Sequence, residues 1–125
     1  MNISEVSEKL NISKHTLRYY EELGIIPPVE RNEKGIRIYS EEDCKWVRVS
    51  QCMKKSGMSL KSIKRYVKLC SMGNKTKEKR LKLLIKEKEK LEEVIEAMNE
   101  GLELLKKKIK LYQSDEEYSA HYKTK

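Results

Sequence analysis

Residues 13–24, Ser-Lys-His-Thr-Leu-Arg-Tyr-Tyr-Glu-Glu-Leu-Gly, decide the fold of this chain. Ser13 is a good helix N-cap, because its hydroxyl can accept a hydrogen bond from an amide of the first turn. Gly24 suits the left-handed residue that ends a helix, and Pro27-Pro28 prevents the helix from resuming. The stretch therefore predicts a short helix between Ser13 and Gly24.

The two faces of this helix differ in chemistry. Neighbouring side chains on a helix point about 100° apart, so they cannot all serve one core. We expect Tyr20 to bury its ring and offer only its hydroxyl, whereas Arg18 and Tyr19 project outward. One side gathers Thr16, Leu17, Tyr20 and Leu23; the other carries His15, Arg18 and Glu22, with Lys14 nearby and Tyr19 at the boundary.

A first short helix is predicted before this one. Ile3, Val6 and Leu10 fall on one helical face, and Asn11 suits the turn that follows. Two short helices joined by a tight turn, with cationic and hydroxyl groups on the second, indicate a helix-turn-helix. In that motif the second helix enters the major groove, where arginine suits guanine and tyrosine, serine or lysine reaches phosphates.

Residues 29–39 change to an alternating pattern that predicts a small β-hairpin. We expect Ile36 and Ile38 to face inward and Arg37 and Tyr39 to face outward, with Gly35 supplying a positive φ in the loop. Arg31, Lys34 and Arg37 lie on and beside the loop. They suit a wing that grips the DNA backbone, although a solvated charged loop explains them too.

Two further helices are predicted between residues 40 and 74. Ser40 and the acids after it suit a helix start, and Gly57 ends that helix. Ser59 caps the next helix, which we expect to end near Gly73-Asn74. One side of that helix carries Leu60, Ile63, Val67 and Cys70.

Basic residues gather where this fourth helix begins. Lys54 and Lys55 precede it, and Lys61 lies in its first turn. A cation there opposes the helix dipole, unless an anion such as a phosphate binds the amides after Ser59. Basic features at three separate element ends make nucleic acid the expected anion.

The chain beyond residue 74 has a heptad repeat of apolar residues. Residues 81–112 would form a helix of about 48 Å, too long to fold against so small an N-terminal part. An identical chain is the simplest partner for the stripe; the alternative is a long helix that folds back on its own domain. The repeat runs through Leu81, Leu84, Lys88, Leu91, Ile95, Met98, Leu102, Leu105, Ile109 and Tyr112, with Gly101 as a weak point.

Composition sets the remaining limits. The 125 residues carry a net charge of +8, with 28 lysines and arginines against 20 acids, which favours an anionic partner. We expect neither a signal peptide nor a membrane span. Three cysteines without disulfide-framework spacing fit a reducing cytoplasm. The chain has no glycine-rich phosphate loop, metal cluster or nucleophile–base pair, so we do not expect an enzyme.

The sequence resembles the MerR family of transcription regulators. Residues 16–27, Thr-Leu-Arg-Tyr-Tyr-Glu-Glu-Leu-Gly-Ile-Ile-Pro, closely match the family's signature helix. Arg37-Ile-Tyr39 resembles its wing, Ser40 to Asp43 the start of its third helix, and Gly57 to Leu60 its second wing. The similarity runs from residue 2 to about residue 72, and the expected dimerisation helix follows.

This resemblance implies a mainly α fold. A winged helix-turn-helix DNA-binding domain would occupy residues 1–72, a dimerisation helix in an antiparallel coiled coil residues 75–112, and a short tail residues 113–125. It also implies a homodimer on a palindromic operator in double-stranded promoter DNA. Members of the family distort this DNA so that RNA polymerase can use the promoter.

The residues predicted to contact DNA combine the family's positions with the basic and hydroxyl groups described above. The resemblance itself implies Arg18, Tyr19, Tyr20 and Arg37. The full predicted set is Ser13, Lys14, His15, Thr16, Arg18, Tyr19, Tyr20, Arg31, Lys34, Arg37, Tyr39, Lys55, Ser59 and Lys61. The predicted dimerisation residues are Leu81, Leu84, Leu91, Ile95, Met98, Leu102, Leu105 and Ile109.

The signal is predicted by elimination among the family's known classes. Its metal sensors carry cysteines near the start of the long helix and in a C-terminal loop, but residues 73–125 contain no cysteine and only His121. We therefore expect no metal site and no cofactor. Drug-sensing members carry a large C-terminal ligand domain, whereas this sequence continues for only 13 residues after Tyr112.

A thiol is the remaining candidate sensor. Cys52 has Arg48 and Lys55 on its side of the third helix, and neighbouring cations favour the nucleophilic thiolate. Cys44 and Cys70 are expected in the core. The chain thus resembles the small aldehyde- and nitrosative-stress branch of the family, whose lone cysteine matches Cys52.

Several alternatives stay open. Cys52 can be an unreactive, partly buried helix cysteine, as isolated cysteines commonly are. Ser50 and Ser56 stand where relatives more often have apolar residues, so the packing around the third helix can differ and the burial of Cys52 stays open. The signal can also be a small apolar ligand or a protein. Outside this class, the chain can be a coiled-coil adaptor whose basic surface only keeps it dissolved.

Overall fold

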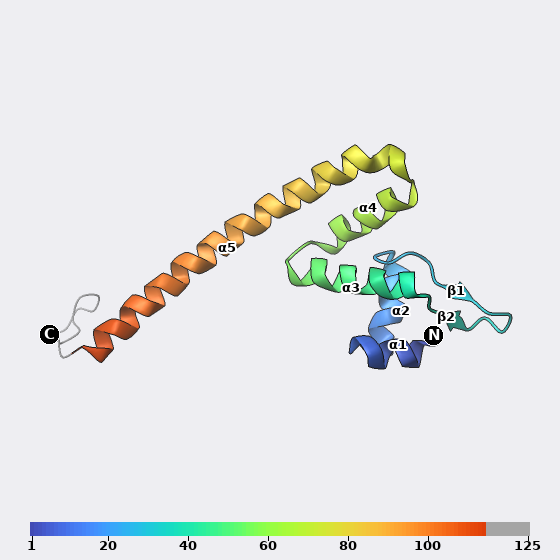
Figure 1. Cartoon of the computed structure of the whole chain (residues 1–125), viewed down its shortest axis with the longest axis horizontal. Coiled ribbons are helices and arrows are strands. Elements are labelled where there is room, and N and C mark those ends of the chain that lie inside the picture. Colours follow the sequence, from blue (N-terminus) through green and yellow to red (C-terminus); the bar gives the residue numbers. More distant parts are fainter. Residues whose placement is uncertain (115–125) are drawn as a thin grey trace. The chain divides into compact units, whose positions relative to one another are not determined.

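A computed structural model describes residues 1–114, so the predicted tail lies almost wholly outside the described residues. The described part is mainly helical with one small hairpin, which confirms the predicted fold class (Figure 1). In chain order the elements are α1 (Ile3–Leu10), α2 (Lys14–Leu23), β1 (Glu30–Arg31), β2 (Arg37–Ile38), α3 (Glu41–Lys55), α4 (Leu60–Ser71), the 3-10 helix η1 (Asn74–Thr76) and α5 (Lys77–Gln113).

The short helices begin and end at their capping residues. The Ser13 hydroxyl accepts a hydrogen bond from the Thr16 amide over 3.0 Å, and Gly24 ends α2 in the left-handed region with φ of +76°. Asn2 and Glu5 form a reciprocal capping box at α1, as Ser40 and Asp43 do at α3. Each such cap stabilises a helix by about 1 kcal/mol, which explains why sequence signals place these boundaries so closely.

A single apolar core joins the first four helices. Leu17 of α2, Val47 of α3 and Ile63 of α4 are each fully buried. Ile25 and Ile26, in the segment that follows α2, are buried with them. Burial of each such side chain stabilises the fold by about 1.5–3 kcal/mol, so this core holds the recognition helix in place.

The hairpin has the predicted strands, but its faces were predicted wrongly. Glu30 lies opposite Ile38 in the antiparallel pair. Tyr39 is only 1% exposed, whereas Ile36 and Ile38 are 52% and 43% exposed. The reason is tertiary: the Tyr39 amide donates to the Met1 carbonyl and the Met1 amino group donates to the Tyr39 carbonyl, both over 2.7 Å. This pairing directs the tyrosine ring, rather than the isoleucines, into the core.

The two serines that depart from the family's apolar pattern have defined partners. Ser50 is fully buried on α3, and its hydroxyl donates to the Ile25 carbonyl over 2.5 Å. Ser56 is half-buried at the end of α3, and its hydroxyl donates to the Met53 carbonyl over 2.8 Å. Ser50 therefore connects α3 to the segment between α2 and the wing.

The connection from α4 to α5 contains a turn that the sequence analysis missed. The helix α4 ends at Ser71, close to the predicted end at Gly73-Asn74, and η1 follows. Thr76 is buried there, and its hydroxyl donates to the Leu69 carbonyl over 2.6 Å and to the Gly73 carbonyl over 2.9 Å. A buried threonine thus determines where the chain leaves α4.

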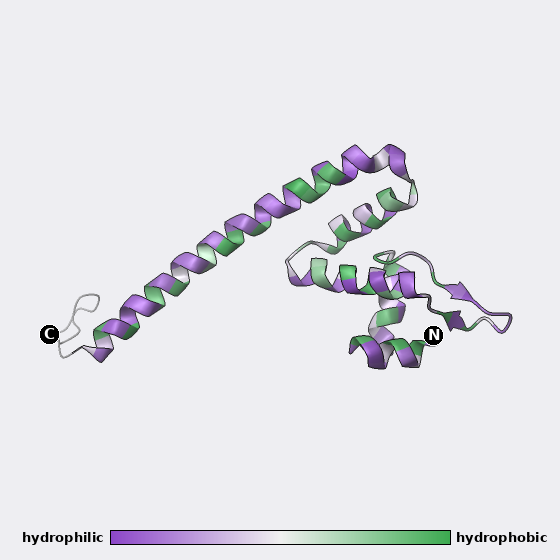
Figure 2. Cartoon of the chain, in the orientation of Figure 1, coloured by the Kyte–Doolittle hydropathy of each residue, from purple (hydrophilic) through white to green (hydrophobic). Residues whose placement is uncertain are grey.

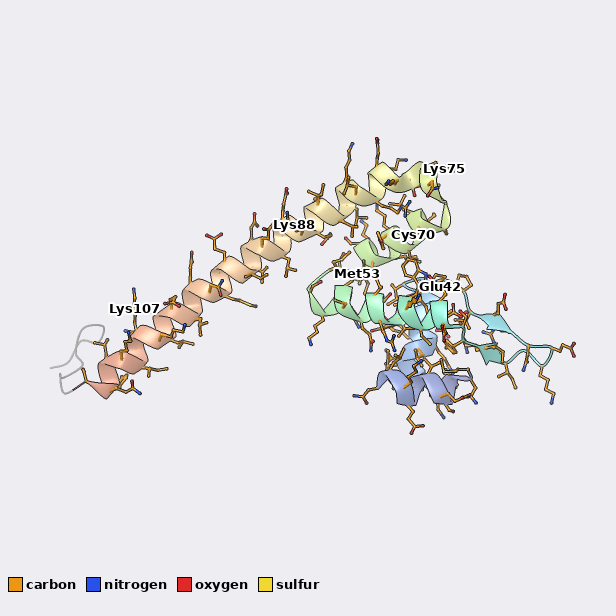
Figure 3. The ribbon with its side chains drawn as sticks, viewed as in Figure 1. Glu42, Met53, Cys70, Lys75, Lys88 and Lys107 are labelled. Atoms are coloured by element: carbon orange, nitrogen blue, oxygen red, sulfur yellow. The ribbon has the colours of Figure 1, made fainter. Side chains whose placement is uncertain are left out.

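The helix α5 is continuous for 37 residues and has no buried residue in the single chain. Green apolar and purple polar bands alternate along it (Figure 2). The boundary between two compact units of the chain falls after Glu87, inside this helix. The next residue, Lys88, is the polar interruption of the heptad seam and forms an exposed ion pair with Glu92 (Figure 3). Exposed pairs of this kind stabilise a helix only weakly, and the apolar stripe of α5 stays uncovered in the single chain.

Candidate nucleic-acid interface

The outer face of α2 carries the predicted recognition groups. Lys14, His15 and Arg18 are exposed, and the ring of Tyr19 is 42% exposed. Neither Lys14 nor Arg18 forms a salt bridge with any residue in the described range, 1–114, so both cations are available to an external anion. Ser13 and Thr16 bond to each other at the start of the helix over 2.7 Å. The structural role of these two hydroxyls is therefore to cap the start of α2.

The ring of Tyr20 is buried, as predicted, and with 4% of the residue exposed it has almost no surface for its predicted DNA contact. Its side chain belongs to the apolar core, and burial raises the pKa of its hydroxyl. The ammonium group of Lys54 lies 5.6 Å from the centre of the Tyr20 ring, a cation–π contact. This contact brings the cationic end of α3 beside α2, close to the exposed Lys55.

The wing loop is ordered by one asparagine. The side-chain oxygen of Asn32 accepts from the amides of Lys34 and Ile36 over 2.9 and 3.0 Å. Gly35 adopts a positive φ of +77°, as expected for this turn, and its carbonyl accepts from Arg31 over 3.0 Å. Arg31 and Lys34 remain exposed on the wing, where a phosphate backbone would meet them.

Arg37 has a different role from the one predicted. Its guanidinium pairs with the Glu21 carboxylate over 2.6 Å, and only 16% of its side chain is exposed. The other carboxylate oxygen of Glu21 accepts from the Val29 amide over 2.7 Å. The pair therefore joins α2 to the wing, and Arg37 acts as a positioning residue. Only the small exposed part of its side chain is left for the predicted DNA contact.

The Glu21 carboxyl responds to this environment. Burial raises its pKa, but the hydrogen bonds from Arg37 and from the Val29 amide, with the positive charges of Arg37 and Arg31, outweigh it. The net pKa lies below the ordinary value, so the carboxylate is charged at neutral pH. Sequence analysis missed Glu21 because its partner lies 16 residues away and no local pattern links them.

Tyr39 does not fit its predicted role as a DNA contact. Its ring is buried, burial raises the pKa of its hydroxyl, and the buried hydroxyl oxygen has no hydrogen-bond partner among residues 1–114. A side chain in this position has no surface to offer a phosphate. The predicted DNA contact of Tyr39 is therefore wrong. The reason is the one that reversed the hairpin faces: the backbone pairing with Met1 directs the Tyr39 ring into the core.

The start of α4 keeps its predicted features. The Ser59 hydroxyl accepts from the Ser62 amide over 3.1 Å, and the first turn holds no acidic residue. Lys61 is exposed in that turn. The helix dipole disfavours a lysine at this end of α4. A phosphate bound to the first amides of the helix would offset this effect, so the arrangement suits a phosphate.

Comparisons with known proteins decide the family. The model of the MerR HTH family regulatory proteins matches residues 1–70, more than half of the chain. The HTH-type transcriptional regulator AdhR of Bacillus subtilis (strain 168) is 42% identical over 91 residues, which are 73% of this chain and 65% of that relative. The chain belongs to the MerR family. The chain thus spans less than two thirds of AdhR.

Solved structures agree with this membership. A MerR family transcriptional regulator from Listeria monocytogenes is 39% identical, with a TM-score of 0.90 over 92% of this chain and 87% of its own. HiNmlR, a MerR family regulator lacking the sensor domain and bound to promoter DNA, is 37% identical, with a TM-score of 0.81 over 90% and 89%. This MerR protein is a DNA-binding transcription regulator, and its relatives support the AdhR- and NmlR-like branch.

The cysteines of this MerR regulator lie in three different environments. Cys52 is exposed in the last turns of α3, with Arg48 and Lys55 also exposed on that helix. Cys44 is buried in the core, as predicted. Cys70 is only partly buried, so its predicted core position is half right. Cys52 is therefore accessible from solvent rather than partly buried.

The predicted dimerisation residues of this MerR regulator are accessible in the single chain. Leu91 is half-buried, and the exposed fractions of the other predicted residues run from 37% for Leu84 to 69% for Met98. Ile85 and Val94, beside the seam, are exposed as well and widen the stripe. Within residues 1–114, no group of three or more histidine, cysteine or acidic side chains is placed to hold a metal ion, and no helix is long and apolar enough to cross a membrane.

Proposed function

We propose that this MerR regulator is a homodimer that binds a palindromic promoter operator and distorts it to control transcription by RNA polymerase. The recognition helix carries the supporting observation: Lys14, Arg18 and Tyr19 are exposed on α2 without salt bridges inside the described range. The wing is fixed to that helix by Arg37 and Glu21. A relative of 37% identity is bound to promoter DNA, which supports the same partner here.

Dimerisation follows from the apolar stripe of α5. Two antiparallel copies would cover Leu91, Ile95 and Met98 with their equivalents and would present two recognition helices to the DNA. Half-sites one or more helical turns apart, about 34–36 Å per turn, would match such a two-fold arrangement. The predicted partners are therefore double-stranded DNA and a second copy of the chain.

Operator binding is tested by substitution and by salt. Arg18→Ala should lose about 1–3 kcal/mol of discrimination at one base pair, if Arg18 reads that base directly. Lys61→Ala should weaken binding to all sequences and reduce the slope of log affinity against log salt by about 1. Lys86→Ala, which also removes one exposed cation, is the matched control. A salt-independent affinity would favour the coiled-coil adaptor instead.

The proposed signal is an electrophile, an aldehyde or a nitrosating compound, sensed by Cys52. The thiol is exposed on α3, and α3 contacts both α4 and the core that holds α2. A modified Cys52 side chain would therefore change the packing of a helix that positions the DNA-binding elements. The likeness to AdhR supports this branch of the family.

The thiol proposal is tested by two serine variants. Cys52→Ser should abolish induction of a reporter by formaldehyde or S-nitrosoglutathione and leave operator affinity unchanged. Cys70→Ser is the matched control, because Cys70 lies on α4 and is only partly buried. Unaltered induction in the Cys52 variant would exclude this thiol as the sensor and favour a different signal.

The proposed DNA distortion has its own measurement. Fluorescence transfer between dyes at the two operator ends should report a shorter distance in the activated complex than in the resting complex. Transcription in vitro should rise in the same samples. Activation without any change in end-to-end distance would exclude distortion and would leave operator binding intact.

A further inference from the structure

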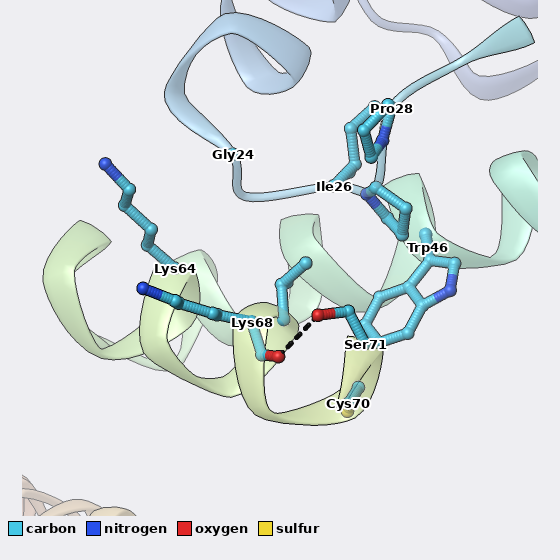
Figure 4. A pocket seen from close by; sticks show the side chains of 10 residues that line it. Gly24, Ile26, Pro28, Trp46, Lys64, Lys68, Cys70 and Ser71 are labelled. Atoms are coloured by element: carbon cyan, nitrogen blue, oxygen red, sulfur yellow. Dashed lines mark hydrogen bonds between the residues drawn. The ribbon is translucent and has the colours of Figure 1, made fainter. Parts of the chain in front are cut away.

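An apolar hollow lies in the first unit, bordered by the end of α2 and by α4. Its volume is about 420 Å³, within the range of about 300–1,000 Å³ typical of small-molecule sites. The segment Gly24–Pro28, the α3 residue Trp46 and the last turns of α4 form its walls (Figure 4). Three elements that are separate in sequence thus enclose one space.

The walls of this hollow are mainly apolar. Ile26 and Val67 are buried and form its inner side, whereas Trp46 is half-buried and shows its indole to the space. Pro27 and Pro28 add rigid apolar surface from the segment after α2. A flat or aliphatic group of a ligand would find contact on several sides here.

The charges of the hollow all have one sign. Lys64 and Lys68, one turn apart on α4, are its charged lining residues, and no carboxylate lines it. Neither lysine forms a salt bridge within the described part of the chain. Figure 4 shows the two lysine side chains on one side of the space and Trp46 on the other. Such a site selects an apolar molecule with an anionic end.

We propose that this hollow binds a small apolar carboxylate, with its carboxylate at Lys64 and Lys68 and its hydrocarbon part against Trp46. A neutral apolar molecule would leave both cations unused, and a cation would be repelled. The occupant is thus defined by the walls and by the charge together. A segment of a second copy of the chain is the main competing occupant, and the experiment separates the two.

The position of the hollow connects it to the recognition helix. Gly24 is the residue that ends α2, and a Cβ placed on it would lie 3.7 Å from the Cε atom of Lys64. The Lys64 side chain therefore runs close to the end of α2, and a carboxylate that draws Lys64 into the hollow would move it relative to that end. The binding claim stands alone, but this regulatory consequence rests on the proposed function.

Binding is measured on the full-length protein without DNA, with sodium octanoate as the probe. Trp46 is the single tryptophan of the chain, so its fluorescence reports the hollow directly. Octanoate should change the emission saturably and should bind about tenfold or more tightly than octan-1-ol. Octylamine should not bind.

Substitutions identify the residues that bind the probe. The double variant Lys64→Gln, Lys68→Gln should lose about tenfold or more in octanoate affinity and keep its octanol affinity. Lys45→Gln removes a cation beside Trp46 that does not line the hollow, and should bind octanoate like the wild type. Ser71→Phe, at an exposed lining position, should fill the space and abolish binding while circular dichroism shows an intact fold.

Defined results would overturn the proposal. Equal affinity for octanoate and octanol, or an unchanged affinity in the double lysine variant, would exclude the carboxylate site. Octanoate binding that appears only after the dimer is dissociated would assign the hollow to a second copy of the chain.

A separate arm tests regulation. Octanoate should shift the operator affinity of the wild type and leave that of Ser71→Phe unchanged. If octanoate binds at Trp46 but the protein ignores every operator, the proposed function fails and the binding site stands. If operator binding is normal and octanoate does not bind, only this inference fails.

Discussion

The unit that carries the recognition helix and the helix α5 use apolar residues in opposite ways. In the first, side chains such as Leu17 and Ile63 are fully buried inside one chain. In α5 no residue is buried, and apolar residues such as Met98 and Leu105 are more than half exposed. The first region thus has its own apolar core, whereas the second would acquire buried apolar contacts from the proposed second copy of the chain.

This difference separates two kinds of stability. Packing inside one chain gives a free energy of unfolding that does not depend on protein concentration. Packing between chains gives a stability that rises with concentration, since association is linked to folding by mass action. Each prediction below changes one of these regions and asks whether the other responds.

The largest expected effect is loss of the dimer on charging the seam. Ile95→Glu with Leu102→Glu places four carboxylates in the interface of two chains. Each apolar side chain lost from burial removes about 1.5–3 kcal/mol, so dimer affinity should fall about ten-thousandfold or more. Analytical ultracentrifugation should find monomers at micromolar concentration, and operator affinity should fall with it.

The matched control for the seam is Lys107→Glu. Lys107 lies on the same helix (Figure 3), and the heptad spacing places it on the side away from Leu102 and Leu105 of the seam. The variant should remain a dimer. If both variants remain dimeric, the apolar stripe is not the dimer interface.

A second prediction compares two leucines directly. Leu17→Ala, in the packed unit, should lower the free energy of unfolding by about 2–5 kcal/mol at every protein concentration. Leu105→Ala, in α5, should lower the melting temperature most at low concentration and little at high concentration. Calorimetry over a hundredfold concentration range checks both. The same concentration dependence in both variants would remove the distinction between the two regions.

The sequence predicted the packed unit well where the signals are local. The caps Ser13, Ser40 and Ser59 and the terminal Gly24 placed three helices closely, because each signal acts within a few residues of its own position. The apolar seam of α5 could also be predicted from the sequence, since a heptad repeat depends only on the spacing of apolar residues. These signals need no knowledge of the rest of the fold.

The errors occur where a distant residue decides. The hairpin alternation was correct, but its inward face depends on the pairing of Tyr39 with Met1, 38 residues earlier. The role of Arg37 depends on Glu21, and the hydroxyl of Ser50 depends on the carbonyl of Ile25. No local pattern carries such information. The exposed DNA-facing cations remain predictions, while the contacts that position them required the structure.

The third prediction concerns the link between α2 and the wing. Glu21→Gln should lower the free energy of unfolding by about 1.5–3 kcal/mol at neutral pH, because Arg37 loses a charged hydrogen-bond partner. The folded-state pKa of Glu21 is depressed, so its contribution is present above the ordinary value of 4.5 and is lost as the pH falls through the folded-state value. The difference between wild type and variant should therefore shrink on acidification.

Chemical unfolding between pH 7 and pH 3 measures this change. Glu22→Gln removes a neighbouring but exposed carboxylate and is the control, expected to change stability by about 0.5 kcal/mol or less. A gap between wild type and Glu21→Gln that grows toward low pH would contradict the assignment. Such a result would mean that Glu21 is not held in its charged form by Arg37.

The smallest predicted effect tests how tightly the packed unit is joined to its recognition helix. Ser50→Ala removes the buried donor and leaves the Ile25 carbonyl unsatisfied, at a cost of about 1–2 kcal/mol. Ser56→Ala also removes a serine hydroxyl from α3, but its bond is local and half-exposed, so about 0.5 kcal/mol or less is expected. Because Ile25 follows directly after the end of α2, Ser50→Ala should also speed amide hydrogen exchange in the last turn of α2 and leave α5 unchanged. Equal effects from the two serines would show that the buried bond does not join α3 to the recognition helix, and that apolar packing alone holds them together.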